Sequence, residues 1–527
     1  MTARLLRAAA IGAAGLLALS ACGGGGGNEA GSPGTGAANV AVVLGTTDQV
    51  GTVDPAGSYD LPGWTIIYNT FQNLLNIPAG GNTPEPDAAK SCEFTDPTHY
   101  QCVLNDGLKF SDGSALTAKD VAFSFERIVK INDPNGPASL LANMDSVAAT
   151  DDATVVFTLK KPDATWPFIL ATGAGAIVSS ATYPAAALQP NEKLLGSGPY
   201  KLTKFTEGQQ AAFVANTNYA GKAKLANNQF VVQYFNDASA LKLAIEKGDV
   251  DVAYRSLSPT DITSLRGEAD KGVKIVEGNG TEIRYIVFNV TKAPADNKAV
   301  RQAVAQVIDR DAIAKNAYDG TVTPLYSMIP VGLEGHTDSF KDKYGTPDVA
   351  KAKALLEASG VQTPVNLELW WTPSHYGPNS SDEYTEIKRQ LDASGLFSVT
   401  LKSSEWEQYK KSYADGAYAQ WELGWFPDFP DADNYTSVFL VDGGFEKNNY
   451  SNPTVNDLVA KEIGSTDAKV RADTFAEIQK ITAEDVPLLP VWQGKQIAAT
   501  RDNVTGVEKT FDPSFTFRFW LVGKSAS

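Results

Sequence analysis

The sequence of 527 residues has few residues that could bind transition metals. Its three histidines are His99, His336 and His375. No two of them have the spacing of metal ligands, and this argues against histidine-based zinc chemistry. Basic residues are also scarce, since 45 Lys and Arg stand against 61 Asp and Glu for a formal net charge of −16. An acidic surface repels phosphates, so we exclude nucleic acid as a partner.

Common enzyme motifs are also missing. Residues 523–525 read Gly-Lys-Ser, but Arg518 stands where the first glycine of a phosphate-binding loop belongs. Residues 196–198 lack the spacing of a hydrolase nucleophile elbow. We therefore expect no metal, no cofactor and no catalytic residue. A secreted cell-wall hydrolase stays open as the alternative from another class, because so many carboxylates always permit a glycosidase-like pair.

The composition is that of a large globular protein, with 43% hydrophobic and 10% aromatic residues. Helical and strand patterns alternate along the chain, which favours a mixed α/β fold. A capping box at Thr117 and Asp120 predicts a helix over residues 117–130, and Asn297 and Asp237 can begin two others. Short runs rich in β-branched or aromatic residues predict strands at 153–160, 230–235, 283–290 and 366–371.

The first 21 residues have the three-part plan of a secretory signal. Arg4 and Arg7 precede an apolar run over residues 8–19 that is too short to span a bilayer. The signal closes with Leu-Ser-Ala-Cys and resembles a bacterial lipobox, which would make Cys22 a lipid anchor; an ordinary signal with a coincidental cysteine is the alternative. Residues 23–39 include eight glycines, typical of a flexible tether.

The two other cysteines fit an oxidising compartment outside the cytoplasm. Cys92 and Cys102 lie in two strand-like runs on either side of an Asp-Pro turn. A disulfide between them is easy to form across a hairpin. No Cys-x-x-Cys motif is present, so we expect a structural bond without a redox role.

Four segments resemble a known family. Residues 105–128, which read NDGLKFSDGSALTAKDVAFSFERI, are similar to the signature of the bacterial extracellular solute-binding proteins of family 5. Three further segments follow in the family's order: GSGPY at 196–200, FN at 288–289 with VRQA at 300–303 and IDR at 308–310, and GWFPDFPD at 424–431. This family includes the dipeptide- and oligopeptide-binding proteins of ABC importers. Ser111 and Ala432 depart from residues that are frequent in the family.

The resemblance implies a two-lobed α/β fold of the periplasmic-binding-protein type, with an extra subdomain and a hinged cleft. Residues 283–290 and 486–492 could carry the chain between the lobes, or be plain core strands. The expected organisation is a signal peptide (1–21), a lipidated cysteine with a Gly-rich tether (22–39), lobe I (40–282) with an inserted subdomain (about 76–195), lobe II (283–490) and a C-terminal return to lobe I (491–527).

The resemblance also suggests the ligand contacts. In peptide-binding members an aspartate after a Gly-Trp pair meets the peptide's α-amino group, and Asp428 has that place here. A carboxylate that faces an ammonium in a closed cleft gains a charge-assisted hydrogen bond. The candidate aromatic walls for side chains of different shape are Trp425, Trp406, Tyr59, Trp64 and Trp492.

The function implied is that of a lipid-anchored, monomeric substrate-binding component of an ABC importer. It would capture peptides on the outer face of the cell membrane and deliver them to a permease, without catalysis. Two alternatives keep the fold: one binds another small solute, such as a nickel chelate or a sugar, and the other is a receptor that passes peptide signals to a partner.

Overall fold

The computed structural model describes residues 40–525 except 256, 374 and 378. The signal peptide, Cys22 and the Gly-rich segment expected from the sequence therefore lie outside the described residues. No helix in the described part of the chain has both the length and the apolar character needed to cross a membrane.

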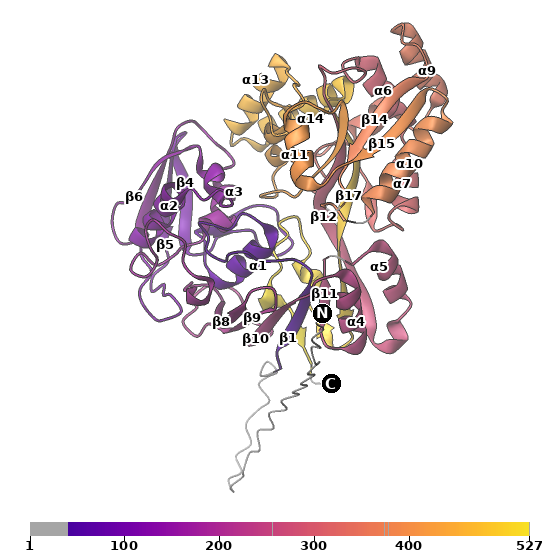
Figure 1. Ribbon diagram of the computed structural model, residues 1–527. Helices are drawn as coiled ribbons and strands as arrows, with labels where there is room; N and C mark the ends of the chain where they lie inside the picture. The colour runs from indigo at the N-terminus through magenta and orange to yellow at the C-terminus, as the bar shows by residue number, and fades with distance from the viewer. Residues whose placement is uncertain (1–39, 256, 374, 378, 526–527) are drawn as a thin grey trace, which may run out of the picture. The chain divides into compact units, whose positions relative to one another are not determined.

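An eleven-stranded sheet runs through the protein (Figure 1). Ten of its strands follow the order β15-β14-β16-β12-β17-β11-β1-β10-β9-β8, and β13 pairs with β17. Its strands are β1 (Val42–Thr46), β8 (Tyr200–Thr206), β9 (Gln210–Ala215), β10 (Gln229–Tyr234), β11 (Val252–Tyr254), β12 (Val273–Phe288), β13 (Val322–Pro324), β14 (Val365–Trp371), β15 (Phe397–Ser403), β16 (Gln420–Trp425) and β17 (Leu488–Arg501).

Two long antiparallel strands, β12 and β17, belong to both ends of this sheet. The first half of β12 pairs with the last half of β17, beside β11, whereas its second half pairs with both β16 and the start of β17. The register shifts between Asn279 and Ile283, where the two halves meet. We call the end with β11, β1, β10, β9 and β8 lobe I, and the end with β16, β14 and β15 lobe II.

A separate four-stranded sheet holds the disulfide. Its order is β4-β5-β7-β6, built from β4 (Ala89–Asp96), β5 (His99–Leu104), β6 (Met144–Ala149) and β7 (Thr154–Leu159). Cys92 and Cys102 face each other across the β4–β5 hairpin and are bonded, which confirms the predicted pair. Helix α2 (Ala118–Ile131) covers this sheet, with Phe125 packed edge-on against Phe157 at 4.9 Å between ring centroids.

Local capping explains where several helices begin, as the sequence predicted. The Asp120 carboxylate of α2 accepts a hydrogen bond of 2.9 Å from the Thr117 amide. Asp237 caps α4 (Ala238–Lys247), which ends at Gly248 with φ +78°. Asn297 caps α6 (Lys298–Val307) by accepting from the Ala299 amide at 2.9 Å.

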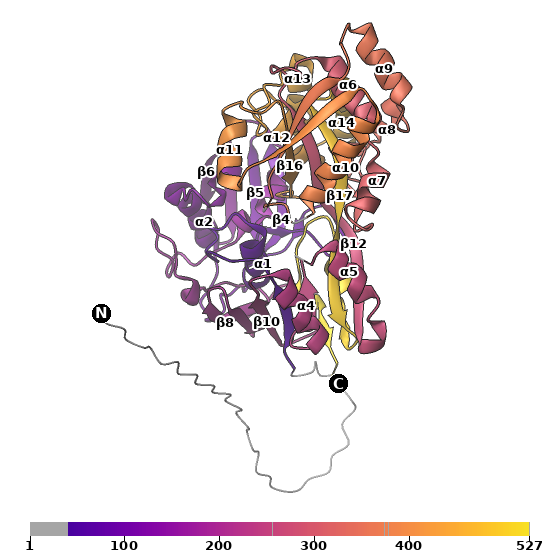
Figure 2. The ribbon, with the colours of Figure 1, turned by 45° about the vertical axis from the view of Figure 1, so that its right-hand side comes forward.

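The other helices pack around these sheets. Figures 1 and 2 both show α5 beside β12, with α4 next to it. In lobe II, α10 packs against β14 and β15, whereas α9 packs against α6. The α-helices not yet given are α1 (Leu61–Thr70), α3 (Trp166–Leu170), α5 (Pro259–Arg266), α7 (Arg310–Asn316), α8 (Ser339–Tyr344), α9 (Val349–Ala358), α10 (Ser380–Ala393), α11 (Trp406–Ala414), α12 (Ser437–Leu440), α13 (Pro453–Ile463) and α14 (Ala468–Asp485). Two pairs of two-residue strands complete the set: β2 (Leu75–Asn76) with β3 (Glu85–Pro86), and β18 (Val504–Thr505) with β19 (Gly523–Lys524).

Each part has its own apolar core. In lobe I, Phe519 stacks on Phe230 at 3.9 Å between ring centroids. In lobe II, one core lies between β14, β15 and their helices, and a second surrounds the fully buried Trp421. A further core fills the four-stranded sheet and α2. Because separate cores hold the two lobes, they can act as firm walls on either side of a site between them.

Candidate functional site

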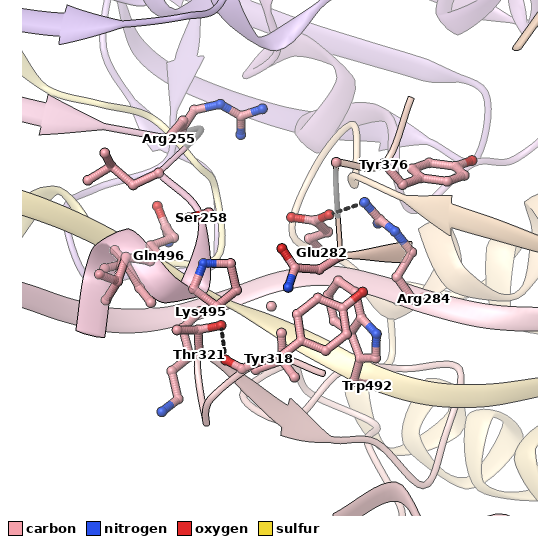
Figure 3. A pocket seen from close by; sticks show the side chains of 18 of the residues that line it. Arg255, Ser258, Glu282, Arg284, Tyr318, Thr321, Tyr376, Trp492, Lys495 and Gln496 are labelled. Atoms are coloured by element: carbon pink, nitrogen blue, oxygen red, sulfur yellow. Dashed lines mark hydrogen bonds and ion pairs between the residues drawn. The ribbon is translucent and has the colours of Figure 1, made fainter. Parts of the chain in front are cut away.

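A cavity of about 540 Å³ lies where the two lobes meet (Figure 3). Residues that follow strands of lobe I form one side, whereas the other side comes from lobe II and its neighbouring loops. The long strands β12 and β17 cross between them. Its lining includes Thr47, Asp48, Tyr254, Arg255 and Ser258 from lobe I, Tyr318, His375, Tyr376 and Phe426 from the other side, and Glu282, Arg284, Trp492, Lys495 and Gln496 from the crossing strands.

The lobe I side is built at the ends of two parallel strands. β1 and β11 pair in parallel, so Asp48 and Arg255 follow the carboxyl ends of neighbouring strands. Ligands of open α/β sheets gather at such ends. Nε of Arg255 donates to Oδ2 of Asp48 at 2.8 Å. Burial by itself lowers the pKa of Arg255, but Asp48 and the nearby Tyr254 and Glu282 raise it overall, so the guanidinium stays charged.

Glu282 and Arg284 bring charge to the strand that crosses between the lobes. They alternate with the fully buried Ile283 on β12 and so share the opposite face of the strand. Their ion pair measures 2.6 Å, and the Arg284 guanidinium lies over the rings of Tyr376 at 4.2 Å and Trp492 at 5.0 Å. Figure 3 shows this pair across the cavity from Arg255.

A buried carboxyl holds one aromatic wall in place. Glu383 on α10 accepts hydrogen bonds through Oε2 from Nε1 of Trp492 at 2.9 Å and from the Tyr318 hydroxyl at 2.6 Å. The two rings pack at 4.8 Å. Burial raises the pKa of Glu383, and also raises the pKa of the neighbouring Glu422 to about 8. Trp492, one of the predicted residues, is therefore a fixed part of the cavity wall.

Asp428 lies just beyond β16, near the cavity without lining it. Its Oδ1 accepts a hydrogen bond of 2.7 Å from the Tyr59 hydroxyl, and Asn434 donates weakly to Oδ2 at 3.4 Å. Burial raises the pKa of Asp428 to about 6, although both hydrogen bonds lower it. Phe426, two residues earlier, does line the cavity. The structure thus brings the predicted Asp428 and Tyr59 into direct contact.

Trp425 and Trp406 also lie outside the lining of this cavity. Nε1 of Trp425 donates to Oδ1 of Asn434 at 3.0 Å, and that same oxygen accepts from the Asp428 amide at 2.9 Å. Trp425 therefore helps to fix the turn that carries Asp428. Trp406 begins α11 and stacks on the His375 ring at 3.7 Å, so it supports a residue that does line the cavity. Burial lowers the pKa of His375 to about 4.

Trp64 on α1 is 5% exposed and packs in a small core of lobe I. Its Nε1 donates to the Ser58 carbonyl at 2.8 Å. Its ring lies 5.6 Å from that of Tyr59, so it supports the residue that bonds Asp428. The six aromatic and acidic residues predicted from the sequence therefore divide into one wall residue, Trp492, and a group around Asp428 and His375.

Sequence reasoning missed the charged residues of the cavity, namely Asp48, Arg255, Glu282, Arg284 and Lys495. For Glu282 and Arg284 a signal existed, because they flank the apolar Ile283 where the predicted strand 283–290 begins. A buried charge in a strand needs a partner or a function. Among the residues that the structure describes, no group of three or more His, Cys, Asp or Glu side chains could hold a metal ion.

Known proteins with similar sequences bind different solutes. The probable D,D-dipeptide-binding periplasmic protein DdpA of Escherichia coli K12 is 26% identical over 479 residues, which cover 88% of this chain and 90% of that protein. Heme-binding protein A of Haemophilus influenzae is 27% identical over 471 residues, covering 83% and 84%.

The fold is also found among solved structures. The substrate-binding protein CtaP of Listeria monocytogenes, at 24% identity, superposes with a TM-score of 0.81 and covers 93% of this chain and all of that one. Residues 83–447 match the model of the middle region of the bacterial extracellular solute-binding proteins, family 5. This chain has a two-lobed α/β architecture with a cavity between the lobes. It belongs to the bacterial extracellular solute-binding proteins, family 5.

Proposed function

We propose that this protein captures peptides in the cavity between its lobes and delivers them to the membrane permease of an ABC importer. The observation that carries the proposal is the origin of the lining, since lobe I, lobe II and both crossing strands contribute side chains to one cavity. A ligand there touches both lobes at once. The D,D-dipeptide-binding relative supports peptides as the class of ligand.

Capture works through the relative stability of two conformations. A ligand that contacts both lobes binds the closed conformation more tightly than the open one, and so increases the closed population. The permease then recognises the closed protein. In this mechanism lobe I comprises residues 40–282, with the inserted subdomain at about 76–195, and the C-terminal return at 491–527. Lobe II comprises residues 283–490. Strands β12 and β17 are the crossing segments.

Asp428 is the proposed partner of the peptide's ammonium group. Its carboxylate already accepts one hydrogen bond at Oδ1 and a long one at Oδ2, and carboxylate oxygens can accept more than one donor each. Burial makes the lone charge costly, which a bound ammonium would offset. Trp492 lines the peptide's path, and Trp425, Trp406, Tyr59 and Trp64 shape it.

The proposal includes a place and a state for the protein. It is a monomer without catalytic activity, held on the outer face of the cell membrane by lipid on Cys22. Several acyl chains on one cysteine bind a membrane far more firmly than a single chain. Cys22→Ser should move the protein from the membrane fraction to the soluble fraction, and a variant that stays with the membrane would contradict the anchor.

The test is binding of short peptides without turnover. Peptides that bind the native state should raise the melting temperature by an amount that grows with their concentration. Mass spectrometry of the same mixtures should find every peptide intact. A melting temperature that stays flat across a peptide library would overturn the assignment of peptides, and cleaved peptide or glycan would favour the hydrolase instead.

The role of Asp428 has its own control. Asp428→Asn should weaken the binding of peptides with a free amino group by about 10-fold or more relative to the binding of their N-acetylated forms, because a charge-assisted hydrogen bond is lost. Asp145→Asn, at an exposed position on β6, should leave the affinity for both peptide forms unchanged. Equal weakening of both peptide forms by Asp428→Asn would mean that the carboxylate does not meet the amine.

A further inference from the structure

Arg255 has a backbone conformation that disfavours its own side chain. It follows β11 with φ +66°, in the left-handed region that glycine adopts without cost and that an arginine does not. Such strained residues gather at functional sites, where the side chain is needed in that place. Arg255 lines the cavity described above.

The Arg255 side chain is held from both lobes. Its Nε donates to Oδ2 of Asp48 at 2.8 Å, and its guanidinium lies 5.0 Å from the centroid of the Phe426 ring. Asp48 follows β1 in lobe I, whereas Phe426 follows β16 in lobe II. The guanidinium is therefore already oriented before any ligand arrives, which lowers the entropy cost of binding.

The outer edge of this guanidinium has unused donors. No described residue accepts a hydrogen bond from Nη1 or Nη2 of Arg255, and the side chain is 25% exposed. These two nitrogens carry four N–H groups in a flat fork, the geometry that a carboxylate accepts as two parallel hydrogen bonds. Figure 3 shows the side chain reaching along the cavity.

The charges around the cavity favour an anion. Three cations line it, Arg255, Arg284 and Lys495, against two carboxylates, Asp48 and Glu282. This excess of positive charge occurs in a chain whose formal net charge is −16. Arg284 is engaged by Glu282 and by two aromatic rings. Lys495 pairs with Glu277 and donates to the Gly320 carbonyl, so Arg255 is the lining cation whose terminal nitrogens have no acceptor among the described residues.

We propose that Arg255 binds a carboxylate of the captured solute through Nη1 and Nη2 and thereby selects for acids. The proposal rests on the function proposed above and names one specificity-determining contact of the same site. In a peptide the carboxylate is either the C-terminal one or that of an acidic side chain. With Asp428 at the ammonium, the two contacts would recognise opposite charges of one ligand.

The experiment is calorimetric titration of wild type and of Arg255→Gln with three forms of each short peptide: free acid, C-terminal amide, and amide with one acidic side chain. Wild type should bind at least one carboxylate-bearing form about 10- to 100-fold more tightly than the plain amide. Arg255→Gln should lose most of this preference. The form that wild type prefers tells which carboxylate is bound.

Two further variants separate this role from a structural one. Arg255→Gly should lose the preference for acids as fully as Arg255→Gln does, because glycine tolerates φ +66° and keeps the backbone in place but has no donor. Arg389→Gln, on the exposed surface of α10, should keep the wild-type preference. An Arg255→Gln or Arg255→Gly protein that keeps the full preference would overturn the proposal.

The same measurements distinguish failure of the proposed peptide capture from failure of the Arg255 contact. If wild type binds no peptide, peptide capture is wrong, and a panel of small non-peptide acids with their neutral amides then tests Arg255 alone. A preference for acids that depends on Arg255 supports the contact whatever the class of solute. Binding of neutral members as tightly as acids would overturn it.

Discussion

The Tyr59 hydroxyl donates a hydrogen bond of 2.7 Å to Oδ1 of Asp428, across 369 positions of the chain. The bond joins the segment before α1 to the turn after β16, and so links lobe I to lobe II. It also satisfies part of a carboxylate that burial makes costly to ionise. Tyr59 thus binds one oxygen of the Asp428 carboxylate, the group proposed to meet the ligand's ammonium.

Peptide affinity should fall as the pH drops below about 6. Burial raises the pKa of Asp428 to about 6 in the unliganded protein, so the carboxyl is increasingly protonated below that pH. A bound ammonium favours the charged form and lowers this pKa, so binding then requires release of a proton. The loss approaches about tenfold per pH unit. Titration calorimetry from pH 5 to 7 measures it, and Asp428→Asn should lack this dependence. An unchanged pH dependence in that variant would assign it to another group.

Tyr59→Phe should shift the same pH dependence upward. The Tyr59 hydroxyl donates to the carboxylate form of Asp428 and lowers its pKa, so removal of the hydroxyl raises that pKa further. Affinity should then begin to fall at a pH above 6. Carbon-13 NMR of the Asp428 carboxyl group would follow the pKa directly. A midpoint that moves down instead would contradict the hydrogen-bond assignment.

Loss of the buried Arg127–Asp54 pair should destabilise lobe I and its inserted sheet. Arg127 on α2 donates from Nη1 and Nη2 to the two Asp54 oxygens at 2.7 and 2.6 Å, and both side chains are buried. Arg127→Met leaves a buried charge unpaired and should cost about 3 to 5 kcal/mol in unfolding free energy. Lys130→Met, on the exposed face of the same helix, is the matched control. Urea denaturation that gives equal stability for both variants would contradict the expectation.

A methyl group at Gly198 should not fit. A Cβ there would lie 2.5 Å from the Thr70 carbonyl carbon and 2.6 Å from the Phe71 amide nitrogen, both backbone atoms of the segment that ends α1. Gly198→Ala should therefore cost about 1 to 3 kcal/mol in unfolding free energy or more. Gly51→Ala, where a Cβ would meet nothing within 4 Å, should cost little. Chemical denaturation compares the two, and similar stabilities would mean that the backbone shifts without penalty.

Reduction of the disulfide should lower stability by about 3 kcal/mol, since Cys92 and Cys102 close a short loop in the unfolded chain. Denaturation with and without dithiothreitol measures this difference. The double variant Cys92→Ser, Cys102→Ser should be insensitive to the reductant. If the double variant responds as wild type does, reduction acts on something other than this bond.

Local signals predicted several elements well, because the residues that decide them are close in sequence. The capping box at Thr117 and Asp120 and the Asp237 cap with its Gly248 stop lie within one helix each. The disulfide was predicted for a similar reason, since it crosses a tight hairpin. The family segment GSGPY at residues 196–200 is also a local pattern. The close approach of Gly198 to the backbone of Thr70 gives a physical reason for glycine at that position.

The sequence predicted only the end of β12. A strand was expected at 283–290, whereas β12 begins ten residues earlier at Val273. Residues 273–282 include two glycines and several polar residues, which weaken a strand pattern. Their strand forms because β17 supplies backbone partners from Lys495 to Arg501, more than 200 positions away.

By itself, the sequence determined the family, the α/β class, many helix starts and the paired cysteines, because these depend on neighbours in the chain or on motifs kept in order. Only the tertiary structure decided which charges share the cavity. Asp48 and Arg255 are 207 positions apart, and they meet because β1 and β11 pair in parallel and end side by side. Strand pairing over such separations fixes the cavity, since no local pattern specifies which strand ends become neighbours.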